Sequence, residues 1–157
     1  MDIEPTLADH ADETFAFLED VEMWRYYAHQ RPRSLEALRE TYARRAQGPA
    51  DPQQRWENWI LRDVVSRDAI GDLQATISCD TREASIAYGV FPPFRRRGYA
   101  REAVVTLLEH LRAAHGVERA LAEIDTQNTP SLRLVRSLGF LPTGRSGEET
   151  LFERRLV

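Results

Sequence analysis

The chain has 157 residues and a formal net charge of −4, a length that fits one domain able to bury a core without disulfide or metal staples. Its composition, 42% hydrophobic and 29% charged, is near that of soluble globular proteins and excludes a disordered or fibrous chain. The acidity argues against a nucleic-acid partner. The lone cysteine, Cys79, excludes an intrachain disulfide and fits a reducing compartment. Without a signal-peptide pattern or an apolar run of ~20 residues, we expect one cytoplasmic domain, residues 1–157, with no membrane partner.

The first third of the chain is predicted to be helical. Residues 7–18 carry scattered apolar positions among acids. Ser34 has the character of an N-cap, because Leu35, Leu38 and Tyr42 follow it at helical spacing.

From Trp56 the pattern changes to that of strands. We predict strands over residues 56–65, 68–79 and 84–90, with a turn at 80–83 between the last two. The third strand is a short apolar run closed by two prolines, which indicates a buried strand.

A long amphipathic helix is predicted to begin near Gly98 and to end at Gly116. Its apolar stripe consists of Ala100, Val104, Leu107, Leu108 and Leu111. A strand follows over 118–124, and Thr129 is the predicted N-cap of a short helix that Gly139 closes. Two strands complete the chain within 140–156. This order predicts a mixed α/β sheet with a strand–helix–strand crossover in its middle.

Three arginines and a glycine, Arg95 to Gly98, lie between the strand that ends at Val90 and the long helix. The first amides of a helix lack intrahelical acceptors and carry the positive end of its dipole, so they favour an anion. Gly98 and the small Ala100 leave room for a ligand to approach. An isolated basic run is usually a solvated surface, but this one stands in the strand–turn–helix setting of a phosphate site. The loop signatures of nucleotide hydrolases and dinucleotide folds are absent.

The string RRRGYA at 95–100 resembles the R/Q-x-x-G-x-G/A signature of the GNAT acetyltransferase superfamily. Three further segments match in order. Ile70-Gly71-Asp72 resembles the IGE strand start of the branch that includes ribosomal-protein N-terminal acetyltransferases, and 86–90 resembles the strand after it. Asn128-Thr129-Pro130-Ser131 with Leu138-Gly139-Phe140 resembles the N-x-x-S…LGF segment. The similarity runs from about residue 56 to the C-terminus, whereas residues 1–55 agree only in being helical.

The resemblance implies the acyl-CoA N-acyltransferase fold. This is an α/β fold with a mixed, mostly antiparallel central sheet, flanking helices and one splayed pair of parallel strands. Acetyl-CoA, the co-substrate, would lie in the opening between strands 85–90 and 118–124, with Gly89 marking a bend or bulge. The implied cofactor-binding residues are Val90, Arg95, Arg96, Arg97, Gly98, Tyr99, Ala100 and Asn128. For Asn128 a plain turn-forming role is the alternative.

The implied chemistry is direct transfer, in which a neutral amine attacks the thioester carbonyl and a tetrahedral intermediate expels the CoA thiolate. No nucleophile is required, so Cys79 is expected to be an inert strand residue, and we assign no metal ligand. Ser131, at the N-x-x-S position, is the candidate general acid, although a local backbone bond is an equal alternative. Glu123 is one candidate base and Glu148 and Glu149 are others; each is also compatible with a solvated carboxylate, and an amine that arrives neutral would need no base.

The acceptor amine is the least defined part. Five aromatic residues lie in the region that relatives use to face the acceptor: Trp24, Tyr26, Tyr27, Trp56 and Trp59. Each is either part of an acceptor pocket or part of the hydrophobic core. Asp20 and Glu22 would attract a cationic amine, but the sequence does not choose among a protein N-terminus, a polyamine, an aminoglycoside and an amino acid.

The resemblance is compatible with a homodimer. The competing hypotheses are a non-catalytic acyl-CoA-binding or interaction module on the same fold and, less favoured, a nucleic-acid-binding domain that uses the arginine turn with Arg133 and Arg136.

Overall fold

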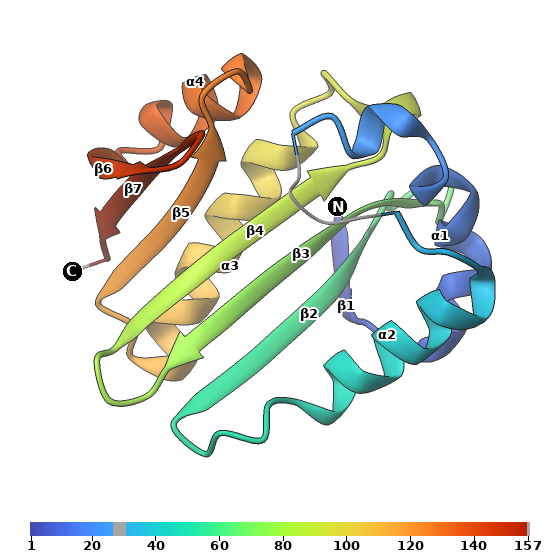
Figure 1. Cartoon of the computed structure of the whole chain (residues 1–157), viewed down its shortest axis with the longest axis horizontal. Coiled ribbons are helices and arrows are strands. Elements are labelled where there is room, and N and C mark those ends of the chain that lie inside the picture. Colours follow the sequence, from blue (N-terminus) through green and yellow to red (C-terminus); the bar gives the residue numbers. More distant parts are fainter. Residues whose placement is uncertain (27–30, 157) are drawn as a thin grey trace.

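A computed structural model describes residues 1–26 and 31–156 (Figure 1). Seven strands form one sheet in the order β1-β2-β3-β4-β5-β7-β6. The strands are β1 (Asp2–Pro5), β2 (Gln54–Arg62), β3 (Ala69–Ser78), β4 (Glu83–Val90), β5 (Arg119–Asp125), β6 (Leu141–Ser146) and β7 (Glu149–Arg155). Neighbouring strands are antiparallel except for the pair β4 and β5, which is parallel. The predicted mixed, mostly antiparallel sheet is therefore confirmed.

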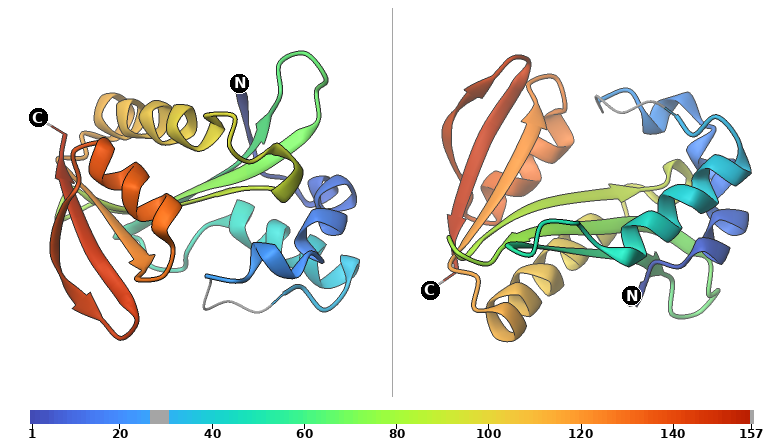
Figure 2. Two further views of the ribbon diagram at one scale, coloured as in Figure 1. Left: turned by 90° about the horizontal axis from the view of Figure 1, so that it is seen from above. Right: turned by 60° about the horizontal axis from the view of Figure 1, so that its bottom comes forward.

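Four α-helices flank this sheet. They are α1 (Ala11–Leu18), α2 (Leu35–Gln47), α3 (Tyr99–His115) and α4 (Thr129–Ser137), and the short 3₁₀ turns are η1 (Ala8–His10), η2 (Val21–Met23) and η3 (Pro92–Phe94). Figure 2 shows α3 on one face of the central strands and α1 and α2 on the other. The sheet is thus the middle layer between two helical layers.

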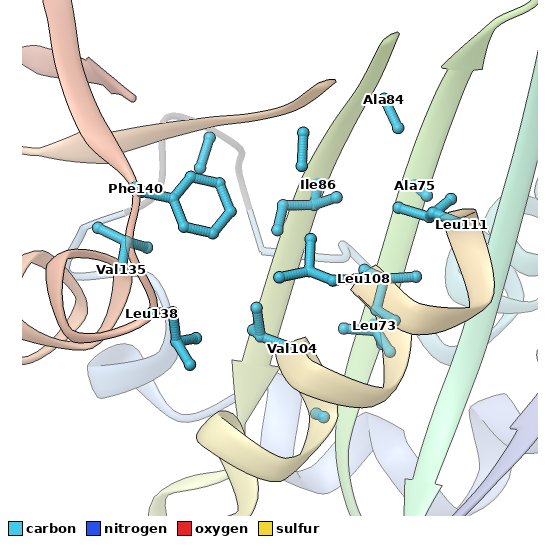
Figure 3. Packing of buried hydrophobic residues seen from close by; sticks show 14 of the residues in the cluster. Leu73, Ala75, Ala84, Ile86, Val104, Leu108, Leu111, Val135, Leu138 and Phe140 are labelled. Atoms are coloured by element: carbon cyan, nitrogen blue, oxygen red, sulfur yellow. The ribbon is translucent and has the colours of Figure 1, made fainter. Parts of the chain in front are cut away.

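Each face of the sheet carries its own core. Leu73 and Ala75 of β3 and Ile86 of β4 point toward α3, where Val104 and Leu108 meet them (Figure 3). Full burial of an aliphatic side chain contributes about 1.5–3 kcal/mol, so this predicted helical stripe fixes α3 across the strands. The opposite core joins α1 and α2 to the sheet through a smaller set: Ala11, Leu18, Met23, Leu38, Tyr42, Ile60, Ala69 and Phe91.

The parallel strands β4 and β5 separate along their length. Their pairing is limited to Glu83 with Arg119, Ala84 with Ala120 and Ser85 with Leu121. Beyond these pairs the two strands diverge, and the gap between their ribbons is visible in Figures 1 and 2. Of the bend or bulge expected at Gly89, the bulge was wrong, because the β3–β4 register runs through that residue without a shift.

The predicted ends of the long helix are confirmed. Gly98 precedes α3 with φ +87° and Gly116 follows it with φ +64°, both in the left-handed region that glycine adopts without a steric penalty. Ser34 caps α2 as predicted, since its Oγ accepts a hydrogen bond from the Ala37 amide at 3.1 Å.

Other boundary predictions were wrong for local reasons. The strand predicted over 56–65 ends at Arg62, because the Asp63 carboxylate accepts hydrogen bonds from the Val65 and Ser66 amides and forms a turn. The cap of α4 is Asn128 instead of Thr129; its side chain accepts from the Ser131 amide at 3.3 Å. The edge strand β1 was missed within a region predicted to be helical.

Candidate active site

A cavity of about 690 Å³ lies where β4 and β5 separate. Residues of both strands form its walls, together with described residues of α1, η2 and α2 and the start of α4. The β4 residues that line it are 85–88 and the β5 residues are 123–125. The splayed strands thus frame a candidate site.

The cavity spans the sheet from one face to the other. Tyr88 is paired in register with Leu73, which packs under α3, so both side chains lie on the α3 face. Asp72 and Gln74 flank Leu73 along β3 and therefore lie on the α1–α2 face. Because Tyr88, Asp72 and Gln74 all line the cavity, it connects the two faces through the gap.

On the α3 face, two hydroxyl groups meet. The Tyr88 hydroxyl donates a hydrogen bond to Ser131 Oγ at 3.2 Å, and burial raises the pKa of Tyr88. Asn128, which caps α4 through the Ser131 amide, lines the same part of the cavity. Ser131 and Asn128 were predicted from their motif. Tyr88 was not among the predicted site residues, and its contact with Ser131 depends on a reach from β4 to the start of α4.

On the α1–α2 face, the principal polar group is Asp72. Gln74 Nε2 donates to its carboxylate at 3.0 Å, and burial raises the pKa of Asp72. Burial also raises the pKa of the neighbouring Tyr42 to about 12, and its hydroxyl lies 3.0 Å from Thr14 Oγ1. Asp72 had been identified only as part of the IGE-like strand start, with no functional role.

Carboxylates outnumber basic side chains in the wall of the cavity. Arg45 is the one basic side chain among the described lining residues, whereas four carboxylates line it: Asp72, Glu123, Asp125 and Glu149. Ala122 and Ile124 are buried against α3 and α4, so Glu123 between them points to the other face, where it is exposed. Of the two alternative bases on the closing hairpin, Glu149 lines the cavity and Glu148 does not.

The turn before α3 presents unpaired amides. Arg96 and Gly98 both have positive φ, +64° and +87°, which is uncommon for a residue with a side chain. The amides of residues 96–98 have no hydrogen-bond acceptor within the part of the chain that the structure describes. With the first amides of α3 they form the kind of concave donor group that binds anions.

The arginine side chains at this turn are used differently. Arg95 donates to the carbonyl oxygens of Val90 at 3.0 Å and Glu22 at 3.2 Å, so it joins the turn to η2. Arg97 donates to the Pro93 carbonyl at 3.3 Å. Arg96 is exposed and has no partner among residues 1–26 and 31–156. It is therefore the arginine of the three whose guanidinium is available to a ligand.

The hydroxyl of Tyr99, the first residue of α3, points away from the cavity. It donates to Asp63 Oδ2 at 2.5 Å and, with the Ser66 and Val65 amides, lowers the pKa of Asp63 to about 2. Tyr99 therefore anchors the helix start to the β2–β3 loop, and only its backbone faces the turn.

Backbone groups of β4 face the gap between the strands. The Phe91 amide donates to the Ile70 carbonyl of β3 at 2.9 Å. Since successive residues of a strand present their amides to opposite sides, Val90 and Tyr88 present theirs toward β5, which has diverged there. A ligand with amide groups could pair with this edge as another strand would.

Several sequence-predicted residues lie elsewhere. Trp24 and Tyr26 line the cavity, whereas Trp59 is buried in the core under α3 and Trp56 is not part of the lining. Asp20 caps η2, and neither it nor Glu22 reaches the cavity. Cys79 is exposed in the turn after β3, outside the strand in which it was expected. Tyr27 lies outside the described residues.

Comparison with known proteins identifies the family. The acetyltransferase (GNAT) domain model matches residues 2–141, which is most of the chain. The chain therefore belongs to the GNAT acetyltransferase family, as its motifs indicated.

Two curated relatives come from Bacillus subtilis (strain 168). The uncharacterized N-acetyltransferase YoaA is 27% identical over 138 residues, covering 85% of this chain and 75% of YoaA. The SPbeta prophage-derived uncharacterized N-acetyltransferase YokL is 29% identical over 84 residues, covering 52% of this chain and 48% of YokL. The match thus spans about half the length of YokL and three quarters of YoaA.

Solved structures share the fold. Spermidine N-acetyltransferase from Vibrio cholerae, in complex with CoA and spermine, superposes with a TM-score of 0.84 at 14% identity, covering 99% of this chain and 95% of that one. Ribosomal-protein-S5-alanine acetyltransferase from Vibrio fischeri gives 0.82 at 14% identity, covering 98% and 91%. Within the described part of this chain, no helix is long and apolar enough to cross a membrane.

Proposed function

We propose that this protein is an N-acetyltransferase that transfers the acetyl group of acetyl-CoA to a primary amine on a cationic acceptor. The observation that carries the proposal is the cavity through the sheet between β4 and β5. Such a passage lets a thioester held on one face meet an amine that enters from the other. Family membership supports the same class of chemistry.

The donor is proposed to bind along the α3 edge of the gap. The unpaired amides of residues 96–98 and the Arg96 guanidinium suit the pyrophosphate, while the amides of Val90 and Tyr88 suit the pantetheine arm. The amide nitrogen of Asn128 is a further donor, since its oxygen is used by the helix cap. When bound, acetyl-CoA would supply an acetyl group activated as a thioester.

Ser131 and Tyr88 are proposed to deliver the proton that a departing thiolate needs. Their hydroxyl groups lie 3.2 Å apart in the cavity, so a proton given by one can be replaced by the other. The raised pKa of Tyr88 keeps its phenol protonated at neutral pH, which a general acid requires.

Asp72 is the carboxylate best suited to accept the proton of the incoming ammonium, directly or through water. Its raised pKa brings its basicity closer to neutral pH than that of an ordinary aspartate. Glu123, the base predicted from sequence, is exposed on the same face of the cavity. We propose that it attracts the cationic acceptor, and that base catalysis by Glu123 is the alternative to be tested beside Asp72.

The acceptor is proposed to carry more than one positive charge. The four carboxylates of the lining exceed its one arginine, which favours a cation by charge complementarity. Trp24, Tyr26 and Tyr42 add aromatic walls of the kind that bind ammonium groups. A polyamine has this chemistry, and the Vibrio cholerae neighbour, a spermidine N-acetyltransferase, is consistent with it.

Thiol release from acetyl-CoA, measured across a panel of amines, tests the proposal. The panel should contain spermidine, spermine, short diamines and an amino-terminal peptide, with amino acids as zwitterionic controls. We expect release with one or more polycations and little with zwitterions. Binding of acetyl-CoA without release across this panel would favour the non-catalytic module, and release with zwitterions alone would contradict the assigned acceptor class.

A further inference from the structure

A second group of polar side chains lies away from the cavity, between β2 and the end of α3. Glu57 of β2 holds its two carboxylate oxygens against two imidazoles. Oε2 lies 2.8 Å from His110 Nε2, and Oε1 lies 2.8 Å from His115 Nε2. The two imidazole rings are edge to face, with centroids 5.2 Å apart.

This group is on the opposite face of the sheet from Asp72. Glu57 precedes Trp59 by two residues on β2 and therefore points to the same face, where Trp59 packs in the core under α3. The Trp59 ring also contacts His110, with centroids 5.5 Å apart. None of these residues lines the cavity, so their arrangement has no role in the proposed transfer reaction.

We propose that Glu57, His110 and His115 form a binding site for a divalent transition-metal ion, Zn²⁺ by its donor chemistry. The three ligand atoms lie within 4.8 Å of one another. Two imidazole nitrogens and one carboxylate oxygen are a donor set that Zn²⁺ takes, with water in the fourth position. Metal–ligand distances of about 2.0–2.1 Å require ligand atoms roughly 3.3 Å apart, which small side-chain rotations would provide.

One atom of the group has no hydrogen bond. His115 Nε2 is buried, and its approach to Glu57 lacks the alignment of a hydrogen bond, so the nitrogen is unsatisfied among the described residues. The His115 side chain is 12% exposed. A buried polar atom without a partner is costly, and coordination to a metal ion would use its lone pair.

The local charges favour a cation on balance. His115 is the last residue of α3, where the carbonyl ends of the helix carry partial negative charge, and Glu57 adds a full one. Arg55 opposes a metal ion, with Nη1 3.5 Å from His115 Nδ1. Because Arg55 is exposed, its guanidinium can move into solvent when an ion binds.

A similar group near the N-terminus provides the contrast. Glu4, His10 and Glu13 also lie close enough to share an ion, but Arg62 already donates to both carboxylates, with Nη1 2.9 Å from Glu13 Oε2 and Nε 2.5 Å from Glu4 Oε1. A guanidinium occupies the position of the cation there. We therefore assign the metal site to the Glu57 group alone.

Titration calorimetry of the untagged, chelator-stripped protein with Zn²⁺ tests this site. We expect one ion per chain, a melting temperature that rises with Zn²⁺ concentration, and affinity that falls in acid, because a metal ion competes with protons for its ligands. Co²⁺ in place of Zn²⁺ should give a visible absorption band that reports imidazole ligation.

Variants identify the ligands. His110→Gln, His115→Gln and Glu57→Gln should each weaken Zn²⁺ binding by roughly 10–100-fold or more, whereas the control variant His10→Gln, in the group that Arg62 already occupies, should bind as the wild type does. Thermal melting in chelator verifies that each variant is folded. The proposal is overturned if wild-type protein shows no saturable Zn²⁺ binding, or if His10→Gln loses binding as the three ligand variants do.

Discussion

Asp72 combines a raised pKa with a position on the α1–α2 face of the cavity. If it is the base, kcat/KM should rise with pH as its carboxyl ionises, and Asp72→Asn should lower kcat/KM about 10²-fold or more and remove that dependence. Glu123→Gln, the matched control, should mainly raise KM for the cationic acceptor. Equal pH profiles in wild type and Asp72→Asn would exclude Asp72 as the base.

Asp72→Asn should lower activity but raise stability at neutral pH. A carboxyl whose pKa is raised in the folded state favours folding below its unfolded pKa of about 3.9 and loses that contribution as pH rises through the folded value. Asp72→Asn should therefore increase the free energy of unfolding at pH 7 relative to wild type, and show no such gain below about pH 3.9. Denaturant unfolding at the two pH values measures this and separates loss of catalysis from loss of fold.

Tyr88 and Ser131 share one hydrogen bond at 3.2 Å. If they act together as the acid, Tyr88→Phe and Ser131→Ala should each lower kcat, and the double variant should lose little more than the worse single one. Steady-state kinetics of wild type, the two single variants and the double variant complete this double-mutant cycle. Additive losses would show that the two hydroxyl groups act separately.

Gly71 has no room for a side chain, since a Cβ there would lie 2.1 Å from the Gly89 carbonyl oxygen. Gly71→Ala should destabilise the protein by about 1–3 kcal/mol or more, because backbone must move. At Gly144 the nearest atom to a Cβ is Leu151 Cδ1 at 3.8 Å, an ordinary contact, so Gly144→Ala serves as the control. Denaturant unfolding of both variants measures the difference, and equal stabilities would contradict the close approach.

Single residues were predictable from sequence where a motif carried them. Ser131 and Asn128 were identified from the N-x-x-S string and do line the cavity. Asp72 and Tyr88 also line the cavity but were not predicted as site residues, because the reach of a side chain across the gap depends on strand register and splay. Hydrophobic patterning determines neither the register nor the splay.

At the scale of elements, α3 connects the proposed phosphate-binding turn to the rest of the fold. Tyr99, at its start, donates to Asp63 and is the largest cause of the lowered pKa of that carboxyl, about 2. Because its pKa is lowered in the folded protein, the Asp63 carboxylate stabilises the fold at pH values above its unfolded pKa of about 3.9. This contribution is lost as the pH falls through the folded pKa of about 2. Tyr99→Phe should therefore raise the pKa of Asp63 and weaken the loss of stability between pH 4 and 2.

Carboxyl NMR titration of Asp63 measures this effect. Tyr88→Phe, which removes a hydroxyl that bonds Ser131 instead, is the control and should leave the Asp63 titration unchanged. An unshifted Asp63 pKa in Tyr99→Phe would contradict the anchoring role of that hydroxyl.

Elements with strong periodicity or clear caps were predictable, as α2 and α3 show. The failures were short or polar: β1 has four residues and depends on pairing with β2, and β2 ends where the Asp63 side chain forms a turn. Such features are set by contacts between distant segments or by side-chain hydrogen bonds, to which hydrophobic patterning is insensitive.

At the scale of the whole molecule, the sheet separates two faces. The cavity between β4 and β5 connects the α3 face to the α1–α2 face, where Asp72 and Glu123 lie. The Glu57–His110–His115 group lies on the α3 face outside that cavity. The sequence alone did not indicate that these three residues lie together. Glu57 and His110 are separated by 53 positions and meet only because α3 packs on β2.

The central claim is that the turn before α3 holds the phosphates of acetyl-CoA. Gly98 and Gly116 are matched, both left-handed and both with no atom within 4 Å of a built Cβ, but at opposite ends of α3. Calorimetry with acetyl-CoA should therefore show binding by wild type and by Gly116→Glu, and none by Gly98→Glu, which places a negative side chain at the phosphate site. Undiminished binding by folded Gly98→Glu, or no binding by folded wild type, would contradict the account.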